Sequence, residues 1–332
     1  MSKVPVFVLS GFLGSGKTTL LERLLAESVN RGLKPAVLMN EIGKRDTDGN
    51  ILLGKSQMIE KLLDGCICCN KKSEVVQSME KLLSLNPDVI FIELTGVANP
   101  EEVADSLTEP QLINQLYLEK VVTLIDAEHI LSYNSVFESD RELVRTTRRQ
   151  IEVADLLIVN KIDLVSEAKK QKVDKLLFKQ NPTSKVTFST FSNVDLASLF
   201  NPLKSPTGRV KVRIKTSNKE DNHHHEHPHK SYTKIKSITL PVPYTTNSIE
   251  IEKFLKKWKT NLLRAKGYLN LEDGTYLMQH VMQRVSWERS TYNGEHYLVL
   301  IGMGLNEDEI KKDGEASFGK QVHLNNTKQG NF

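Results

Sequence analysis

The segment from Gly11 to Thr18 reads Gly-Phe-Leu-Gly-Ser-Gly-Lys-Thr and constrains the fold of this chain more than any other stretch. It fits the phosphate-binding pattern G-x-x-x-x-G-K-[ST]. A short apolar run at 4–10 precedes it, as expected for a buried strand, and leucines recur at helical spacing over residues 20–25. Strand, glycine-rich loop and helix is the arrangement that this motif needs, so a turn that merely caps a helix is the weaker interpretation.

Each residue type in this loop has a chemical reason. Glycines allow successive backbone N–H groups to turn inward around phosphate oxygens, and the helix N-terminus adds partial positive charge. We expect Lys17 to reach the β- and γ-phosphates as a catalytic group and the Thr18 hydroxyl to bind Mg²⁺. The predicted nucleotide-binding residues here are Gly11, Gly14, Ser15, Gly16, Lys17, Thr18 and Thr19.

Composition describes a globular protein of about two domains. The chain has 332 residues, of which 39% are hydrophobic and 26% charged. Its formal charge of +4 is too small to indicate nucleic-acid binding. No apolar run reaches the roughly eighteen residues of a membrane helix, and the N-terminus runs straight into the phosphate loop, unlike a signal peptide. We therefore predict a cytoplasmic protein without nucleic-acid or membrane partners.

Two further apolar runs carry candidate residues at their carboxyl ends. The run at 35–39 leads into Asn40-Glu41-Ile42-Gly43 and a polar stretch to 50, either a mobile loop over the γ-phosphate or a plain surface loop. The run at 88–93 ends in Glu93-Leu94-Thr95-Gly96. A carboxylate at this edge of a parallel sheet is suited to hold Mg²⁺ or orient a water, and a glycine lets a backbone N–H approach the γ-phosphate. Glu93 is thus a catalytic candidate and Gly96 a nucleotide-binding one.

The second strong motif is Asn160-Lys161-Ile162-Asp163, directly after a predicted strand at 155–159. An aspartate accepts hydrogen bonds from both N1–H and the 2-amino group of guanine, whereas adenine has an acceptor at N1 and no such amino group. Lys161 packs its stem along the base. The alternative is a helix start capped by Asp163 or Ser166. Following a phosphate loop, the motif favours GTP, with Asn160, Lys161 and Asp163 as contacts.

Strands alternate with helices through the first two hundred residues or so, with further strands at 120–126 and 185–188 and a helix at 167–179. This alternation predicts an α/β fold with a parallel sheet and right-handed crossovers. The segment 189–192, which follows the last of these strands, is a further candidate for a backbone contact to the base.

The three cysteines lie within four positions, in Gly65-Cys66-Ile67-Cys68-Cys69. This is a poor disulfide framework and indicates a metal or redox site. Thiolates are soft donors that suit Zn²⁺ or Cu⁺, and three of them leave a tetrahedral ion one ligand short, which favours catalysis or handover over storage. The alternative is three buried core residues, against which Gly65 and the polar 70–72 argue. We predict Cys66, Cys68 and Cys69 as metal ligands.

Residues 205–232 form a basic linker rich in histidine. Its imidazoles are typical of a tract that binds zinc, nickel or cobalt loosely. We favour a metal-gathering role over an expression tag or an inert linker. The candidate ligands are His223, His224, His225, His227 and His229.

The remainder predicts a small α+β domain at 233–312, after a first domain at 1–204. Strands are expected at 234–241, 277–285 and 297–303, with a helix at 250–266 and a short one at 306–311. The stretch Arg264-Ala265-Lys266-Gly267 fits the end of the first helix, with cations near its negative pole and glycine in the left-handed cap. The polar segment 313–332 is predicted to be a disordered tail.

Five motifs occur in the order found in the CobW-type GTPases, a metal-chaperone family related to UreG and HypB that includes zinc-regulated GTPase metalloprotein activators. The matching stretches are GFLGSGKTT, NEIG, GCICC, ELTG and NKID, between residues 11 and 163. The resemblance implies a P-loop NTPase domain of the SIMIBI class whose C-x-C-C thiolates bind zinc beside the nucleotide. It also implies that Glu41 joins the metal or magnesium shell, and R-x-K-G resembles a motif of the family's C-terminal domain.

Together these features predict a GTPase that binds zinc and delivers it to a client metalloenzyme, with GTP, Mg²⁺ and Zn²⁺ as cofactors. The reaction is GTP + H₂O → GDP + phosphate without a covalent intermediate. The sequence leaves open whether the chain forms a homo-oligomer. Within the class, the cargo is alternatively cobalt or iron, for cobalamin synthesis or nitrile hydratase activation. The rivals from other classes are a small-molecule kinase and a non-enzymatic zinc store or sensor.

Overall fold

The protein is described from a computed structural model that covers residues 3–40, 59–62, 72–96, 98–137, 139–200, 234–281 and 284–318. The chain divides into two units, Met1–Thr233 and Lys234–Phe332, and each is considered by itself. Within the part of the chain that is described, no helix has both the length and the apolar character needed to cross a bilayer.

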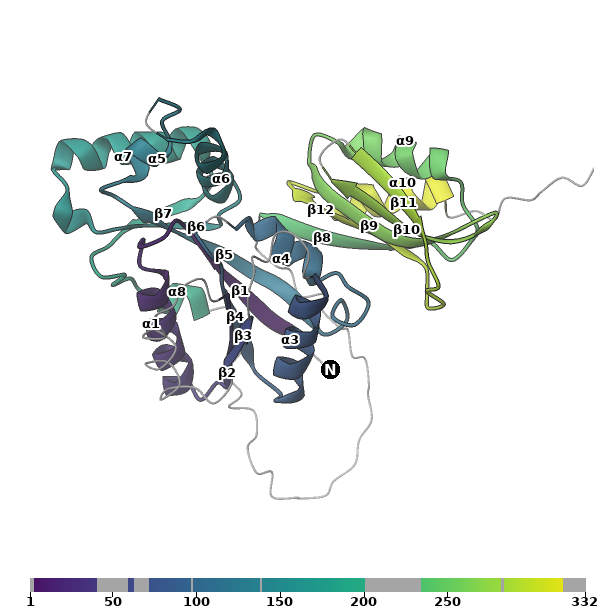
Figure 1. Ribbon diagram of the computed structural model, residues 1–332, viewed down its shortest axis with the longest axis horizontal. Coiled ribbons are helices and arrows are strands. Elements are labelled where there is room, and N and C mark those ends of the chain that lie inside the picture. The colour runs from purple at the N-terminus through teal and green to yellow at the C-terminus, as the bar shows by residue number, and fades with distance from the viewer. Residues whose placement is uncertain are drawn as a thin grey trace, which may run out of the picture. The chain divides into compact units, whose positions relative to one another are not determined.

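The apolar runs of the N-terminal unit form one parallel sheet of seven strands (Figure 1). Its strand order is β3-β2-β4-β1-β5-β6-β7, so the phosphate loop leaves the central strand β1. The strands are β1 (Val4–Ser10), β2 (Pro35–Asn40), β3 (Ile59–Leu62), β4 (Val89–Glu93), β5 (Leu116–Asp126), β6 (Leu156–Asn160) and β7 (Lys185–Phe188).

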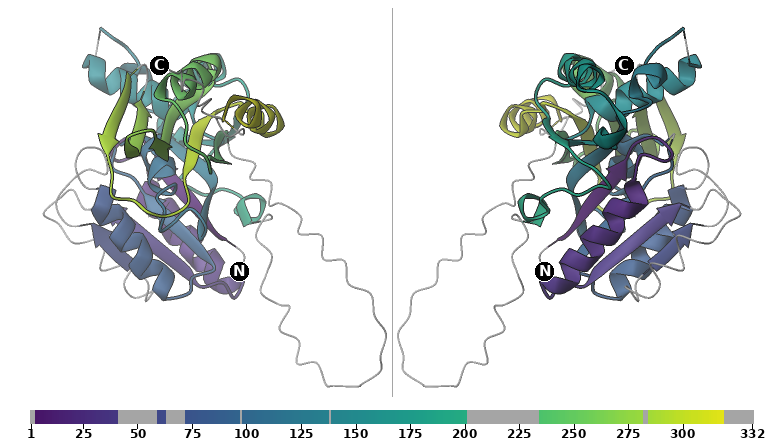
Figure 2. Two further views of the ribbon diagram at one scale, coloured as in Figure 1. Left: turned by 90° about the vertical axis from the view of Figure 1, so that its right-hand side faces the viewer. Right: turned by 90° about the vertical axis from the view of Figure 1, so that its left-hand side faces the viewer.

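Helices cover both faces of this sheet, which explains why its central strands are apolar on both sides. One face packs against α1 and α8 through a cluster that includes Phe7, Phe91 and Phe200. The opposite face packs against α6 and α7 through Ile151, Val173 and their neighbours. Figure 2 shows the flanking helices from two sides. The helices are α1 (Lys17–Asn30), α3 (Lys72–Ser84), α4 (Pro100–Ser106), α5 (Ile130–Tyr133), α6 (Arg141–Glu152), the 3₁₀ turn η1 (Ile162–Leu164), α7 (Glu167–Gln180) and α8 (Ala197–Phe200).

The predicted α/β fold with a parallel sheet is confirmed, and the predicted strands fall within a few residues of those observed. Strand β3 and helix α3 were not predicted, because β3 has only four residues and no flanking motif. Since all strands run in the same direction, Ser10, Glu93, Asp126 and Asn160 end at one edge of the sheet. This carboxyl edge is where ligands bind in open parallel sheets.

The C-terminal unit is an antiparallel sheet of order β11-β10-β9-β12-β8 with helices α9 and α10 packed against it. Its core brings Phe254 of α9 and Phe318 of α10 to 5.1 Å between ring centroids. The elements are β8 (Ile235–Pro241), α9 (Ser248–Trp258), β9 (Leu262–Leu271), β10 (Gly274–Val281), β11 (Arg284–Arg289), β12 (Tyr297–Met303) and α10 (Glu307–Phe318).

Three sequence predictions for this unit are wrong. The helix ends at Trp258, and Arg264–Gly267 lies inside strand β9, where pairing with both β10 and β12 outweighs the helical pattern. The run 277–285 is a hairpin rather than one strand. Helix α10 continues to Phe318, so residues 313–318 are not a disordered tail, because Phe318 packs into the core.

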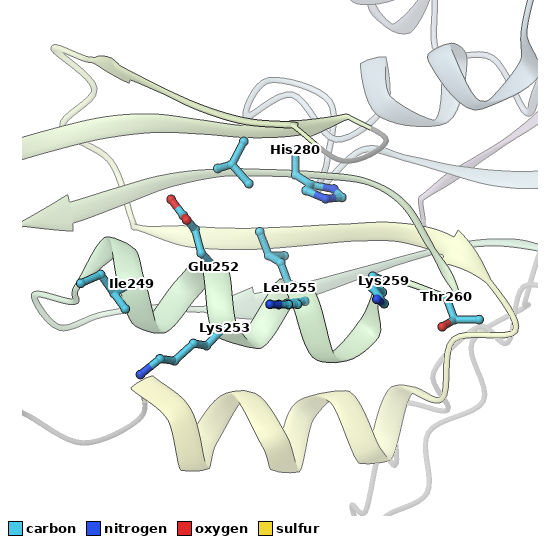
Figure 3. A pocket seen from close by; sticks show the side chains of 9 residues that line it. Ile249, Glu252, Lys253, Leu255, Lys259, Thr260 and His280 are labelled. Atoms are coloured by element: carbon cyan, nitrogen blue, oxygen red, sulfur yellow. The ribbon is translucent and has the colours of Figure 1, made fainter.

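A groove of about 830 Å³ lies between α9 and the β10–β11 hairpin, and we refer to it as the α9 groove (Figure 3). It combines apolar side chains with lysines and one histidine. It is lined by Ile249, Glu252, Lys253, Leu255, Lys256, Lys259, Thr260, His280 and Val285.

Candidate nucleotide site

The phosphate loop joins β1 to α1 with a left-handed glycine as the residue before the helix. Gly16 has φ +104°, and a Cβ atom there would lie 2.4 Å from Asn160 Nδ2, so only glycine fits. The first main-chain bond of the helix runs from the Leu20 N–H to the Gly16 carbonyl at 3.0 Å. The N–H groups of Lys17, Thr18 and Thr19 precede it and have no acceptor within the helix, which suits an anion.

Lys17 is folded over the loop that it follows. Its ammonium donates to the carbonyls of Gly11 at 2.9 Å and Phe12 at 3.1 Å, and the residue is only 6% exposed. Burial lowers the pKa of Lys17, an effect that the nearby Glu93 carboxylate opposes. The side chain is thus a desolvated cation held at the mouth of the loop by neutral acceptors, which phosphate oxygens can replace.

The two predicted magnesium-site residues lie in direct contact. The Thr18 hydroxyl donates to Glu93 Oε1 at 2.9 Å, although the residues are 75 positions apart. A hydroxyl beside a carboxylate is a donor set that suits Mg²⁺, which prefers a few oxygen ligands plus water. Buried hydroxyls at Ser15 and Thr95 have no hydrogen-bond partner among the described residues. The polar lining therefore fits a hydrated magnesium ion with phosphate.

The turn after Glu93 is held in place by a buried glutamine that the sequence did not single out. Gln150 of α6 donates from Nε2 to the carbonyls of Gly96 at 3.1 Å and Ala98 at 3.0 Å. A Cβ atom at Gly96 would lie 2.6 Å from the Leu13 nitrogen, so this position admits only glycine beside the phosphate loop. Gln150 thus fixes the turn that we expect to face the γ-phosphate.

The side chain of Asn160 binds protein groups. It is 3% exposed; Nδ2 donates to the Ser15 carbonyl at 2.9 Å, and Oδ1 accepts from the Ser192 N–H at 2.9 Å and the Ser189 hydroxyl at 3.1 Å. The residue therefore ties the phosphate loop to the segment after β7, and its predicted contact with the nucleotide stays a prediction.

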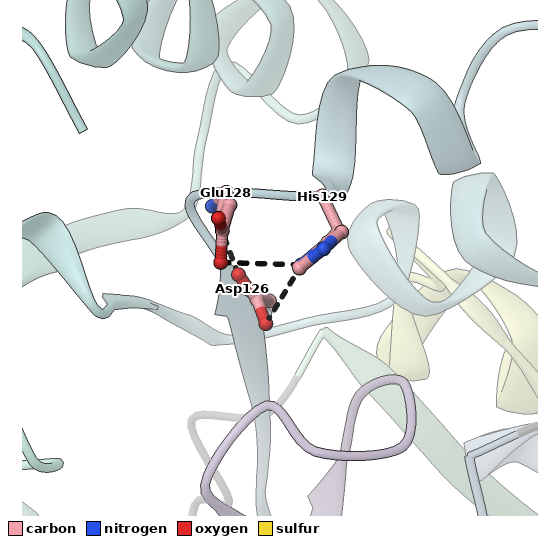
Figure 4. Close-up of side chains that lie close together, drawn as sticks. All are labelled: Asp126, Glu128 and His129. Carbon is pink, nitrogen blue, oxygen red and sulfur yellow. Dashed lines mark hydrogen bonds and ion pairs between the residues drawn. The ribbon is translucent and has the colours of Figure 1, made fainter. Parts of the chain in front are cut away.

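Lys161 is oriented by Asp126, a carboxylate at the end of the neighbouring strand β5. Figure 4 shows Asp126 with Glu128 and His129 beside it. Asp126 Oδ2 accepts from the Lys161 ammonium at 2.7 Å, and His129 Nδ1 lies 3.3 Å from the same oxygen. Burial alone would raise the pKa of Asp126, but the hydrogen bonds from Lys161, the Glu128 N–H and His129 lower it overall. Lys161 itself has φ +62°, a left-handed backbone.

Asp126, Glu128 and His129 are also the one group of potential metal ligands that is found among the described residues. The ammonium of Lys161 already donates to Asp126 Oδ2, and the Glu128 N–H donates to Asp126 Oδ1 at 2.8 Å. The cluster is therefore better explained as the support that aims Lys161. The signal for Asp126 was present in the sequence, since it ends a predicted strand next to β6.

Asp163 is exposed in the 3₁₀ turn after β6, with no partner among the described residues, so its carboxylate is accessible to a base. In the segment after β7, Phe191 and Ser192 both have positive φ, at +51° and +52°. Such backbone strain in ordinary residues concentrates at binding sites. The predicted contact segment 189–192 is thus joined to the guanine motif through Asn160.

The remaining predicted ligands lie outside the described residues. These are Glu41, the thiolates Cys66, Cys68 and Cys69, and the histidines His223, His224, His225, His227 and His229.

Both units of the chain match known protein families. The family description "CobW/HypB/UreG, nucleotide-binding domain" matches residues 5–188, and "Cobalamin synthesis protein cobW C-terminal domain" matches 235–316. Zinc chaperone YjiA of Escherichia coli (strain K12) is 30% identical over 327 residues, covering 94% of this chain and 98% of that protein. Zinc-regulated GTPase metalloprotein activator 1 of Dictyostelium discoideum is 31% identical over 231 residues, covering 60% of this chain and 48% of that protein.

Among solved structures, the Zn(II)-bound YjiA GTPase from E. coli matches 96% of this chain and 99% of its own at 24% identity, with a TM-score of 0.47. The family match in the N-terminal unit spans more than half of the chain, and the second match covers the C-terminal unit. This chain therefore belongs to the CobW/HypB/UreG family.

Proposed function

We propose that this protein is a GTP-hydrolysing metallochaperone that binds zinc through Cys66, Cys68 and Cys69 and passes it to client metalloproteins. GTP hydrolysis is the activity of the N-terminal unit. The observation that supports it best is the 2.9 Å contact between Thr18 and Glu93 beside the buried Lys17, at the carboxyl edge of a parallel sheet. Family membership and the names of the relatives support zinc as the cargo.

The site residues would promote hydrolysis by positioning the phosphates and neutralising their charge. Lys17 and the N–H groups at the start of α1 bind the β- and γ-phosphates, and Thr18 and Glu93 hold Mg²⁺. When bound, Mg²⁺ neutralises charge on the phosphate oxygens. The Gly96 turn, which Gln150 holds in place, would contact the γ-phosphate. Water would attack the γ-phosphorus directly, without a covalent intermediate.

The thiolates follow a strand that belongs to the same sheet. Strand β3 pairs with β2, β2 pairs with β4, and β4 ends in Glu93. Cys66 comes four residues after Leu62, the end of β3, and four residues span at most about 14 Å. This connectivity supports the proposal that the cysteine segment responds to the γ-phosphate, whose binding would tighten zinc binding.

A zinc titration with a non-hydrolysable GTP analogue tests this coupling. By linkage, any factor by which the analogue tightens zinc must equal the factor by which zinc tightens the analogue. Cys66→Ser, Cys68→Ser and Cys69→Ser should each weaken zinc binding, with the nucleotide affinity measured without zinc unchanged. Equal zinc affinities with and without the analogue would remove the coupling, and parallel titrations with Co²⁺ and Fe²⁺ test the alternative cargoes.

A further inference from the structure

The α9 groove carries lysines that find no acidic partner within the part of the chain that the structure describes. Lys253, Lys256 and Lys259 lie one helical turn apart along α9 and its end, and all three are exposed. None of the three has an acidic partner among the described residues. The acidic residue of the groove, Glu252, accepts from Trp287 Nε1 at 3.0 Å. Lysines late in a helix also favour its dipole, so charge alone does not define a binding site.

A buried histidine supplies the second, independent observation. His280 of β10 lines the groove at only 6% exposure, and its Nδ1 has no hydrogen-bond partner among the described residues (Figure 3). Leaving a buried polar nitrogen unpaired costs about 1–3 kcal/mol. A ligand in the groove that hydrogen-bonds the imidazole would remove this cost.

The groove also borders a sheet edge that is unpaired among the described residues. Strand β11 is the first strand in the order of the sheet and pairs on one side, with β10. Its Val285 and Trp287 are half-buried, whereas the alternate residues are exposed. An edge strand presents N–H and C=O groups that an added extended segment can pair with.

Charge argues against this chain's own longer segments outside the described residues as the natural occupant. Residues 201–233 hold seven Lys or Arg against three Asp or Glu, and residues 319–332 hold two Lys and no Asp or Glu. Residues 41–58 and 63–71 carry no net charge. A lysine-lined groove repels the first two and gains nothing electrostatic from the others.

We propose that the α9 groove docks an extended acidic segment of the client protein, added along β11 with its carboxylates against Lys253, Lys256 and Lys259. The six residues of β11 span about 20 Å, and carboxylates two positions apart on such a segment lie about 6.7 Å apart. The lysines cover about 9 Å of helix, which matches two such carboxylates. This inference rests on the proposed client-delivery function and adds the chemistry that selects the client.

The test uses full-length protein and the synthetic octapeptide (Glu-Val)₄ labelled with fluorescein. Anisotropy should show saturable binding that weakens as salt rises from 50 to 200 mM. The triple variant Lys253→Glu, Lys256→Glu, Lys259→Glu should bind at least tenfold more weakly, because attraction becomes repulsion. In a Trp258→Phe background, Trp287 is the remaining tryptophan, and its emission should change on binding.

Matched controls separate groove binding from general charge attraction. Lys312→Glu places one of these three charge reversals on an exposed lysine of α10 and should leave peptide affinity within twofold. The peptide (Glu-Pro)₄ has the charge but lacks the N–H groups at alternate positions, so it should bind at least fivefold more weakly. Unweakened binding by the triple variant, or equal binding of (Glu-Pro)₄ or (Lys-Val)₄, would overturn the proposal. GTP hydrolysis and zinc titration on the same variants should be unchanged, so a failure here is distinct from failure of the proposed function.

Discussion

Lysines lie both at the carboxyl edge of the N-terminal sheet and in the α9 groove, but their hydrogen-bond partners differ. At the carboxyl edge, Lys17 donates to two carbonyls and Lys161 pairs with Asp126. In the α9 groove, the lysines have no acidic partner among the described residues, and His280 lacks a hydrogen bond at Nδ1. The lysines at the carboxyl edge are held in place by hydrogen bonds within the protein, whereas the polar groups of the α9 groove would gain their partners from a ligand. Four substitutions test this contrast, in order of decreasing free-energy effect.

Replacing Lys17 should have the largest effect. Lys17→Ala removes the preorganised cation at the phosphates and should lower kcat for GTP hydrolysis by about 100- to 1000-fold, as loss of a transition-state donor does. Lys3→Ala is the matched control, since Lys3 also donates to a carbonyl, that of Ile113, but from the other end of β1. Phosphate-release kinetics on both variants make the measurement, and equal losses would show that the effect is structural.

Asp163→Asn should change nucleotide preference with little change in stability. An amide donates to the 2-oxo group of xanthine but cannot accept from both guanine donors, so the ratio of kcat/KM for GTP over XTP should fall by about 100-fold. Because Asp163 is exposed without a partner among the described residues, thermal stability should stay within about 0.5 kcal/mol. An unchanged ratio would contradict guanine readout by this carboxylate.

Asn160→Ala, unlike Asp163→Asn, should lower the stability of the protein and leave its nucleotide preference unchanged. Removing its amide leaves the Ser15 carbonyl and the Ser192 N–H without their partner, which should cost about 2 kcal/mol of unfolding free energy. Guanine preference should persist in whatever protein remains folded. Chemical unfolding followed by circular dichroism measures the cost, and a wild-type midpoint would refute the positioning role.

His280→Leu should have the smallest effect and should be stabilising. Removing a buried unpaired nitrogen should raise the unfolding free energy at pH 7 by about 1 kcal/mol. Burial lowers the pKa of His280, so the unfolded chain binds the extra proton and wild-type stability falls as pH drops below about 6.5. The variant should lose this part of the pH dependence.

Tryptophan emission during urea unfolding reports on the C-terminal unit, which contains His280, because the two tryptophans, Trp258 and Trp287, both belong to it. His129→Leu, in the other unit, should leave that transition unchanged. If His280→Leu destabilises the unit at every pH, the imidazole has a partner role that contradicts its unpaired state.

The two surfaces also differ in how far the sequence predicts them. The phosphate loop and the guanine motif are local patterns that end buried strands, so Lys17, Thr18 and Asp163 were identifiable without a structure. The role of Asn160 and the Asp126–Lys161 pair depend on the register Asp126↔Asn160 between β5 and β6, which no local pattern contains. Gln150 was missed for the same reason, since its acceptors lie more than fifty residues away.

In the C-terminal unit, the sequence pattern fails where long-range pairing outweighs local preference. Arg264–Gly267 reads well as a helix end, yet these residues lie between two partner strands in β9. His280 lies on β10 opposite Val285 and Ala265. The sequence around it does not distinguish it from an ordinary surface histidine. The α9 groove is therefore visible only after the sheet has formed.

The bonds of Lys17 and Thr18 to neighbours in their own pocket have a consequence for selectivity. A stray divalent ion would have to break the Thr18–Glu93 bond with no anion to share, and a bare phosphate would have to draw Lys17 from its carbonyls with no counter-ion. Magnesium and nucleotide arriving as one complex compensate both losses at once. The site is therefore expected to bind magnesium and nucleotide more favourably together than either one alone.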